Sequence, residues 1–214
     1  MRITNWKLLE SIETAITEYN NQLWREEDKN LKLDGLEYDD DWESAEVPTE
    51  TLKKLKTLRI SLIAKDTSPE ELEDIINQLS RILDEMDLTL FNFSMNSRGN
   101  QTSNVNLSFL DHLNENVKNF SLTGVDLSQE TSSLFTRFKS LDYFSLQKCN
   151  ISNPSIISEI NPDVIVSLER NTIAPEHYKK ALELIKTSRG RVKFSDRELK
   201  TITRNIFYRS NKIK

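Results

Sequence analysis

Side chains that commonly act as nucleophiles or soft metal ligands are scarce in this chain. Cys149 is its only cysteine, and His112 and His177 are the only histidines among 214 residues. A single cysteine allows neither an intrachain disulfide nor a thiolate metal cluster, and two histidines do not make a His-rich metal site. We therefore expect no metal and no cofactor. We interpret Cys149 as a small buried residue at a turn, not as a nucleophile.

The short motifs of the common catalytic sites are also missing. The patterns G-x-S-x-G, G-x-x-x-x-G-K-[ST], G-x-G-x-x-G and H-E-x-x-H do not occur. These motifs mark a nucleophile elbow, a phosphate loop, a dinucleotide site and a zinc site, respectively. We expect a protein that is not an enzyme. An enzyme, or an enzyme-associated domain, whose site carries no recognised motif is kept as an alternative.

Charge is concentrated in two segments of opposite sign. Ten acidic residues lie between Glu26 and Glu46, against Lys29 and Lys32. Such a run is typical of a solvated linker, and it is also a surface that attracts a basic partner. From residue 197 to 214 there are six basic residues against Glu198. These residues predict a basic cap or tail. We do not expect nucleic acid as a partner, because the whole chain carries a net charge of -5.

Apolar spacing predicts the elements that would position these residues. Residues 4–24 have apolar side chains at steps of three and four, which indicates an amphipathic helix. Residues 55–64 alternate with period two, as in a strand. Ser68, Pro69 and Glu71 then form a helix-start pattern. Strand followed by helix continues along the chain, and this alternation predicts an α/β fold with parallel strands.

The chain shows neither a membrane span nor a signal peptide. No apolar run approaches the roughly 18 residues that a span requires, and the N-terminal residues are amphipathic and include acids. We expect a cytoplasmic protein without a membrane partner. Delivery into a host cell by a route without a classical signal stays open, as for a bacterial effector.

The strand-helix units behave as copies of one pattern. Their central strand residues are Ile60, Met95, Leu122, Leu146, Leu168 and Phe194, and the last five are separated by 27, 24, 22 and 26 residues. Residues 141–151 read LDYFSLQKCNI, residues 163–173 read DVIVSLERNTI, and residues 117–127 read VKNFSLTGVDL. These three segments resemble the motif L-x-x-L-x-L-x-x-N/C-x-L of the leucine-rich-repeat family.

The resemblance implies a right-handed solenoid with a parallel sheet on its concave face, helices on its convex face and helical caps. It divides the chain into an N-terminal helical cap and acidic linker (1–50), a solenoid (51–200) and a basic cap or tail (201–214). Solenoids of this kind use the concave sheet for binding. We therefore expect a non-catalytic protein-protein interaction module whose partner and oligomeric state the sequence does not name.

Residues between the apolar strand positions should face the concave side. One column across the strands contains Ser94, Ser121, Ser145 and Ser167, which indicates strands in register. The candidate partner-binding residues are Tyr143, Arg59, Ile165, Arg191, Ser121, Ser145, Gln147 and Glu169. The alternative within protein recognition is an immunity or inhibitor protein that uses the acidic N-terminal segment.

Overall fold

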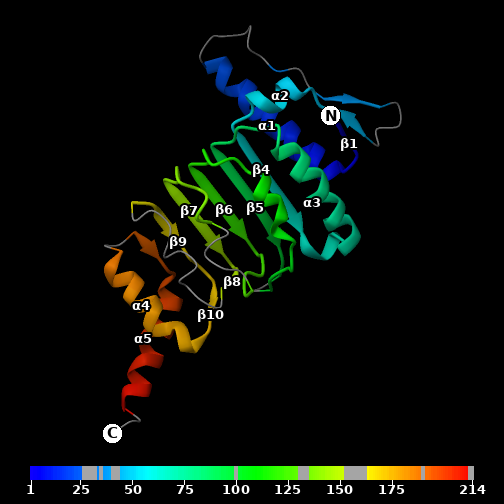
Figure 1. Cartoon of the computed structure of the whole chain (residues 1–214). Coiled ribbons are helices and arrows are strands. Elements are labelled where there is room, and N and C mark those ends of the chain that lie inside the picture. Colours follow the sequence, from blue (N-terminus) through cyan, green and yellow to red (C-terminus); the bar gives the residue numbers. More distant parts are fainter. Residues whose placement is uncertain are drawn as a thin grey trace. The chain divides into compact units, whose positions relative to one another are not determined.

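The computed structural model divides the chain into two compact units (Figure 1). The described residues are 1–25, 33, 36–39, 44–98, 101–129, 135–151, 163–188 and 191–211. Unit 1 consists of Met1–Phe93 and Asn106–Val117, and unit 2 of Ser94–Val105 and Lys118–Lys214. None of the described helices is both long and apolar enough to cross a membrane.

A six-stranded parallel sheet confirms the predicted α/β class. Its strands are β4 (Thr57–Ile63), β5 (Leu90–Asn96), β6 (Asn119–Thr123), β7 (Tyr143–Gln147), β9 (Ile165–Ser167) and β11 (Val192–Lys193). Their order in the sheet is β11-β9-β7-β6-β5-β4. The chain order and the sheet order therefore agree, as expected when each strand is followed by a crossover to its neighbour.

Unit 1 contains the predicted N-terminal helix, α1 (Trp6–Arg25), which packs against β4. It also contains α2 (Thr49–Lys54) and α3 (Pro69–Leu83). The predicted start of α3 is confirmed, because the Ser68 side chain accepts a hydrogen bond from the Glu71 N–H at 3.1 Å. The apolar stripe of α3 is buried, and α3 packs on the short 3-10 helix η3 (Leu107–His112).

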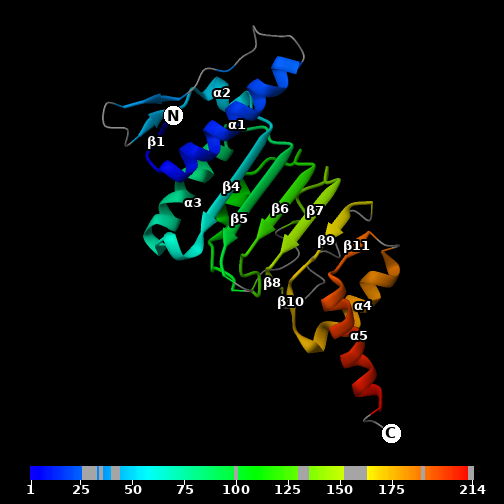
Figure 2. The ribbon, with the colours of Figure 1, turned by 180° about the vertical axis from the view of Figure 1, so that it is seen from behind.

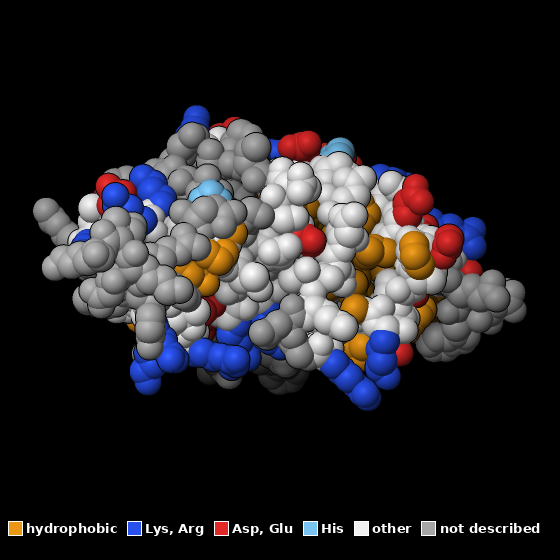
Figure 3. Space-filling model, turned by 90° about the horizontal axis from the view of Figure 1, so that it is seen from below, with side chains coloured by type: hydrophobic (Ala, Val, Ile, Leu, Met, Phe, Trp, Pro, Cys, Tyr) orange, Lys and Arg blue, Asp and Glu red, His pale blue; other side chains and the backbone are white. Residues whose placement is uncertain are grey.

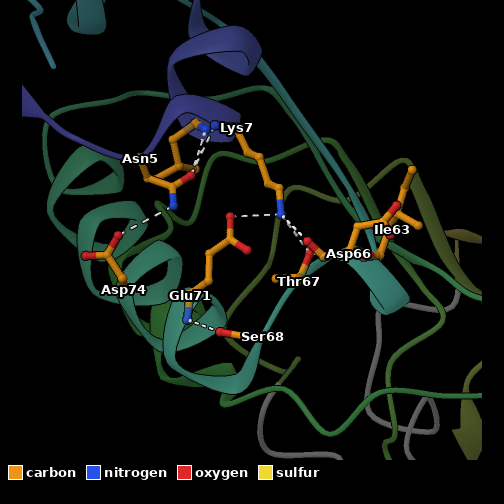
Figure 4. A network of polar contacts seen from close by, with 9 residues as sticks. Asn5, Lys7, Ile63, Asp66, Thr67, Ser68, Glu71 and Asp74 are labelled. Carbon is orange, nitrogen blue, oxygen red and sulfur yellow. Dashed lines mark hydrogen bonds and ion pairs between the residues drawn. The ribbon is translucent and has the colours of Figure 1, made fainter. Parts of the chain in front are cut away.

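A polar network joins the beginnings of α1 and α3 (Figure 4). Asn5 caps α1, since its Oδ1 accepts from the Lys7 N–H at 3.1 Å. The Lys7 ammonium lies 2.8 Å from Glu71 Oε1 and donates to Thr67 Oγ1 and the Asp66 carbonyl, both at 3.0 Å. The Lys7 side chain is only 11% exposed, and three acceptors satisfy its three donors. We interpret Lys7 as a structural residue.

The N-terminus forms a small antiparallel sheet of β1 (Arg2–Ile3), β3 (Ala45–Glu46) and β2 (Glu37–Tyr38), in the order β1-β3-β2. Tyr38 lies on β2 and interacts with the Glu13 carboxylate of α1. Burial, followed by the hydrogen bond and charge of Glu13, raises the pKa of Tyr38 to about 12. The phenol is therefore protonated at neutral pH and links β2 to α1.

Unit 2 buries the apolar strand residues in the predicted alternation. Phe120, Leu122, Phe144 and Leu146 each have no exposed surface. The rings of Phe120 and Phe144 stack at 5.6 Å between centroids with an angle of 11°, because their strands pair in register. The predicted burial of Leu146 at the centre of β7 is confirmed.

Turns of one kind follow three successive strands of unit 2. Gly124, Lys148 and Arg170 occupy the same place after β6, β7 and β9, and all have left-handed backbone with φ of 72°, 49° and 62°. This geometry sends the N–H of Gly124 to the Gln147 carbonyl at 3.0 Å and the N–H of Lys148 to the Glu169 carbonyl at 3.2 Å. Each turn is thereby bonded to the next.

Beyond these turns, β8 (Asn150–Ile151) and β10 (Thr172–Ile173) pair in parallel. Cys149 lies between β7 and β8, is 1% exposed and directs its Sγ to the carbonyls of Leu122 at 3.7 Å and Gln147 at 3.3 Å. Burial raises the pKa of its thiol to about 11. Cys149 is therefore a buried turn residue, as predicted.

The C-terminal part of unit 2 is helical. The 3-10 turn η6 (Pro175–His177) leads into α4 (Tyr178–Thr187), and α5 (Asp196–Asn211) packs on α4. Residues 201–211 of the predicted basic segment lie within α5, which already begins at Asp196. Residues 212–214 of that segment lie outside the described residues.

Candidate functional site

The face of unit 2 opposite the buried phenylalanines is the predicted recognition surface. Figure 2 shows β6 and β7 on this side with no described helix in front of them. Tyr143 pairs in register with Asn119 and Ile165. Ser145 pairs with Ser121 and Ser167, so the predicted alignment of these three serines is confirmed. We call this surface the sheet face; it consists of residues 119, 121, 123, 143, 145, 147, 165 and 167.

The residues of the sheet face differ in exposure, so only some of them can contact a partner. Ile165 is 42% exposed, and Tyr143 beside it is half-buried. Ser145 is only 1% exposed, and no described group hydrogen-bonds its Oγ. Ser121 and Gln147 are half-buried. A partner resting on this surface would meet Tyr143 and Ile165, whereas Ser145 is out of its reach.

Two further candidates of unit 2 are held by local contacts. The Arg191 Nη1 lies 2.9 Å from Asp163 Oδ1, and its Nε donates to the Ser188 carbonyl at 3.2 Å. Glu169 follows the end of β9, and its backbone carbonyl receives the Lys148 N–H. Arg191 would have to exchange an existing ion pair for a new one, so we expect it to contribute less to binding than Tyr143.

Arg59 belongs to unit 1 and is bound to the Glu18 carboxylate of α1. Its guanidinium is thereby used to dock α1 on β4. Arg59 lies on β4 and is not one of the residues that make up the sheet face.

The acidic segment lies mostly outside the described residues. Of its acids, Asp39 receives hydrogen bonds from the Ser44 N–H at 3.1 Å and the Ser44 hydroxyl at 2.6 Å, and it pairs with Arg2 at 3.2 Å. Glu46 lies 3.2 Å from the N-terminal ammonium. These two carboxylates brace the small antiparallel sheet and are partly neutralised.

Apolar exposure is scattered in the described part of the chain. The large apolar side chains with most exposure are Trp6 at 62%, Ile63 at 48% and Ile165 at 42%. Figure 3 shows one face on which the orange apolar atoms form separate patches among polar and charged side chains. Of these three residues, Ile165 lies on the sheet face, in register with Tyr143 on the paired strand.

The sequence-based candidates did not include a cavity in unit 2. A hollow of about 620 Å³ opens between the left-handed turns after β7 and β9 and the first turns of α5. Its lining includes Lys148, Arg170, Tyr178 and Arg197. The signal in the sequence was the eighth position of the repeat motif, where Lys148 and Arg170 align with Gly124.

Comparison with protein families, with curated proteins and with solved structures found no match. Among the described residues, no group of three or more His, Cys, Asp or Glu side chains is placed to hold a metal ion. Function is therefore inferred from the geometry of the chain itself.

Proposed function

We propose that this chain is a leucine-rich-repeat protein that recognises a partner protein through the sheet face and carries out no catalysis. The observation that supports this most directly is the pair of Tyr143 and Ile165. The two residues lie in register on neighbouring parallel strands, and Ile165 is 42% exposed on an otherwise polar surface.

The repeat interpretation is supported by equivalent contacts in successive units. The ninth motif position holds Cys149 in one unit and Asn171 in the next, and each side chain donates to a carbonyl of the preceding strand. Asn171 Nδ2 bonds the Leu146 carbonyl, and Cys149 Sγ faces the Leu122 carbonyl. Leu122 and Leu146 are themselves paired in register. Repetition of equivalent contacts between neighbouring units is the structural property of a solenoid.

Recognition by this surface would depend on few residues. In protein interfaces a handful of side chains, often Tyr, Trp or Arg, account for most of the affinity, and the residues around them mainly exclude water. Tyr143 has two side-chain torsions to order and a large apolar ring, so it can be buried at low entropic cost. Ser121 and Asn119 near Tyr143 are small and polar, which suits residues that mainly exclude water around it.

The test begins with capture of the partner from the native cell and continues with calorimetry on the purified pair. We expect Tyr143→Ala to weaken binding by more than about 1 kcal/mol, which is a factor of roughly five. Trp6→Ala removes an even more exposed aromatic ring away from the sheet face and serves as the matched control. If Tyr143→Ala binds as tightly as the wild type, the sheet face is not the recognition surface.

Charge reversal in the acidic segment distinguishes binding through the sheet face from the alternative of an inhibitor that binds through the acidic segment. Asp39 is unsuitable for this purpose, because its replacement would break the contacts with Ser44 and Arg2. The appropriate variant is Asp40→Lys with Asp41→Lys and Glu43→Lys. For binding through the sheet face we expect this variant mainly to slow association. Complete loss of binding in this variant, with Tyr143→Ala silent, would assign recognition to the acidic segment.

A further inference from the structure

The cavity between the turns of unit 2 has the composition of an anion site. Among the described residues that line it, three side chains are cationic, Lys148, Arg170 and Arg197, and one is a carboxylate, Glu198. The Glu198 Oε2 accepts from the N–H and the hydroxyl of Ser195 at 2.8 and 2.6 Å, and its Oε1 is buried without a hydrogen-bond partner among the described residues. None of the ion pairs among described residues involves any of the three cations.

Two of these cations occupy equivalent turns of successive units, so the repeat itself brings them to one cavity. Lys148 and Arg170 both have positive φ, which glycine adopts without strain and which costs other residues on the order of 1–2 kcal/mol. The equivalent place in the preceding unit holds Gly124. Here both strained positions hold cations, and both line the same cavity.

The rest of the lining suits an organic group beside the charge. Ile202 and Ile173 are almost fully buried under the cavity, and Tyr178 and Thr201 contribute hydroxyls. The hollow of about 620 Å³ lies within the range of small-molecule sites, about 300–1,000 Å³. The cavity continues along α5 to Lys200 and Arg204, which lie near Arg197 and Thr201 in an adjoining depression.

We propose that this cavity binds a phosphate monoester with an apolar organic group. Lys148, Arg170 and Arg197 provide the positive charge for a dianionic phosphate, and arginine forks suit its oxygens. The Tyr178 ring and the partly accessible Ile173 provide the surface for the organic part, above the buried Ile202. Among the described lining residues, three cations against one acid match a dianionic ligand better than a ligand with one negative charge. This site is separate from the sheet face and does not depend on the proposed protein recognition.

The test uses the full chain with phenyl phosphate, inorganic phosphate and benzyl alcohol as probes, titrated by calorimetry at constant ionic strength. We expect saturable one-site binding of phenyl phosphate, at least about fivefold tighter than inorganic phosphate, and no saturation by benzyl alcohol. Equal affinity for the two phosphates would refute the apolar part of the site. Absence of saturable binding up to about 10 mM of either phosphate would refute the anion site itself.

Variants locate the binding. Arg170→Gln and Lys148→Gln should each weaken phenyl phosphate binding at least about fivefold. Arg98→Gln removes an exposed arginine of the same unit outside the cavity lining and should change the affinity less than about twofold. Equal weakening by Arg98→Gln would mean diffuse attraction to basic side chains and would overturn the proposal. Circular dichroism checks that the two turn variants keep the native fold. If either variant does not, Arg197→Gln, on the exposed surface of α5, is titrated in its place.

A final arm distinguishes the source of the phosphate monoester. A pentapeptide with blocked ends and a central phosphotyrosine presents the same aryl phosphate on a protein segment. Affinity above that of phenyl phosphate would assign the ligand to a modified protein, and affinity equal to it or lower would assign a free small molecule. If neither probe binds, the proposal fails, whereas binding of a partner at Tyr143 would be unaffected.

Discussion

The amide side chain of Asn171 closes the turn that contains Cys149. Its Oδ1 accepts the Cys149 backbone N–H at 2.7 Å, while its Nδ2 donates to the Leu146 carbonyl at 2.7 Å. Both bonds are buried, and both backbone groups belong to the preceding strand and its turn. One side chain thus satisfies two groups that the end of β7 would otherwise leave without partners.

Removal of this amide should be costly. Asn171→Ala leaves a buried donor and a buried acceptor unpaired, and each unpaired group costs about 1–3 kcal/mol. We therefore expect a loss of about 2–4 kcal/mol in the free energy of unfolding, measured by urea denaturation. Asn150→Ala, at a half-buried neighbouring asparagine, should change stability by less than about 0.5 kcal/mol. A loss below about 1 kcal/mol for Asn171→Ala would contradict the role of these bonds.

Leu146 should be one of the most sensitive apolar positions. It has no exposed surface and lies at the centre of β7. Leu146→Ala should lower the free energy of unfolding by about 2–5 kcal/mol, because it leaves a cavity in a packed core. Ile165→Ala, on the exposed side of the sheet, is the control and should cost clearly less. A loss of under about 0.5 kcal/mol for Leu146→Ala would mean that the core is not packed around it.

The Cys149 thiol should be inert in the native state. Its pKa is raised to about 11 by burial, so the reactive thiolate is scarce near neutral pH. We expect a disulfide reagent at pH 8 to label native protein only as fast as the protein unfolds. The same reagent should label the chain in urea without delay. Complete labelling of native protein within minutes would indicate an accessible thiol.

The eighth motif position should respond in opposite directions to opposite substitutions. At Gly124 a Cβ would lie 2.0 Å from the Met95 carbonyl oxygen, and φ is 72°. Gly124→Ala should therefore destabilise by at least about 2 kcal/mol. Lys148→Gly should stabilise by up to about 1 kcal/mol, since relief of left-handed strain exceeds the entropic cost of glycine. Thermal or urea unfolding measures both, and a neutral Gly124→Ala would contradict the close approach.

Tyr38 should make stability fall at high pH. Its native pKa of about 12 exceeds the ordinary value of 10.0, so above pH 10 the unfolded chain releases a proton that the native state keeps. The resulting stability is complete below pH 10 and is lost as pH rises toward 12. Tyr38→Phe lacks this component, and its urea midpoint should decline less than that of the wild type between pH 9 and 11.5. Parallel curves for the two proteins would show that Tyr38 does not retain its proton.

The local features of this fold can be predicted from the amino-acid sequence. The start of α3 at Ser68, the alternation along β4 and the burial of Leu146 follow from backbone periodicity, which extends over a few residues and is visible in the chain. The register of Ser121, Ser145 and Ser167 was also predictable, because equivalent residues of successive parallel strands align when the units have one pattern.

Which polar side chains are available to a partner depends on contacts between segments that are distant in sequence. Arg59 and Arg191 were candidates for binding, but the partners that hold them are Glu18 and Asp163, which lie 41 and 28 residues away. The burial of Ser145 depends likewise on the side chains around it and not on its own polarity. Pairing and burial of this kind arise between segments distant in sequence, so no local pattern encodes them. The cavity formed by Lys148, Arg170 and α5 has the same origin, because its walls come from two turns and a helix that only folding brings together.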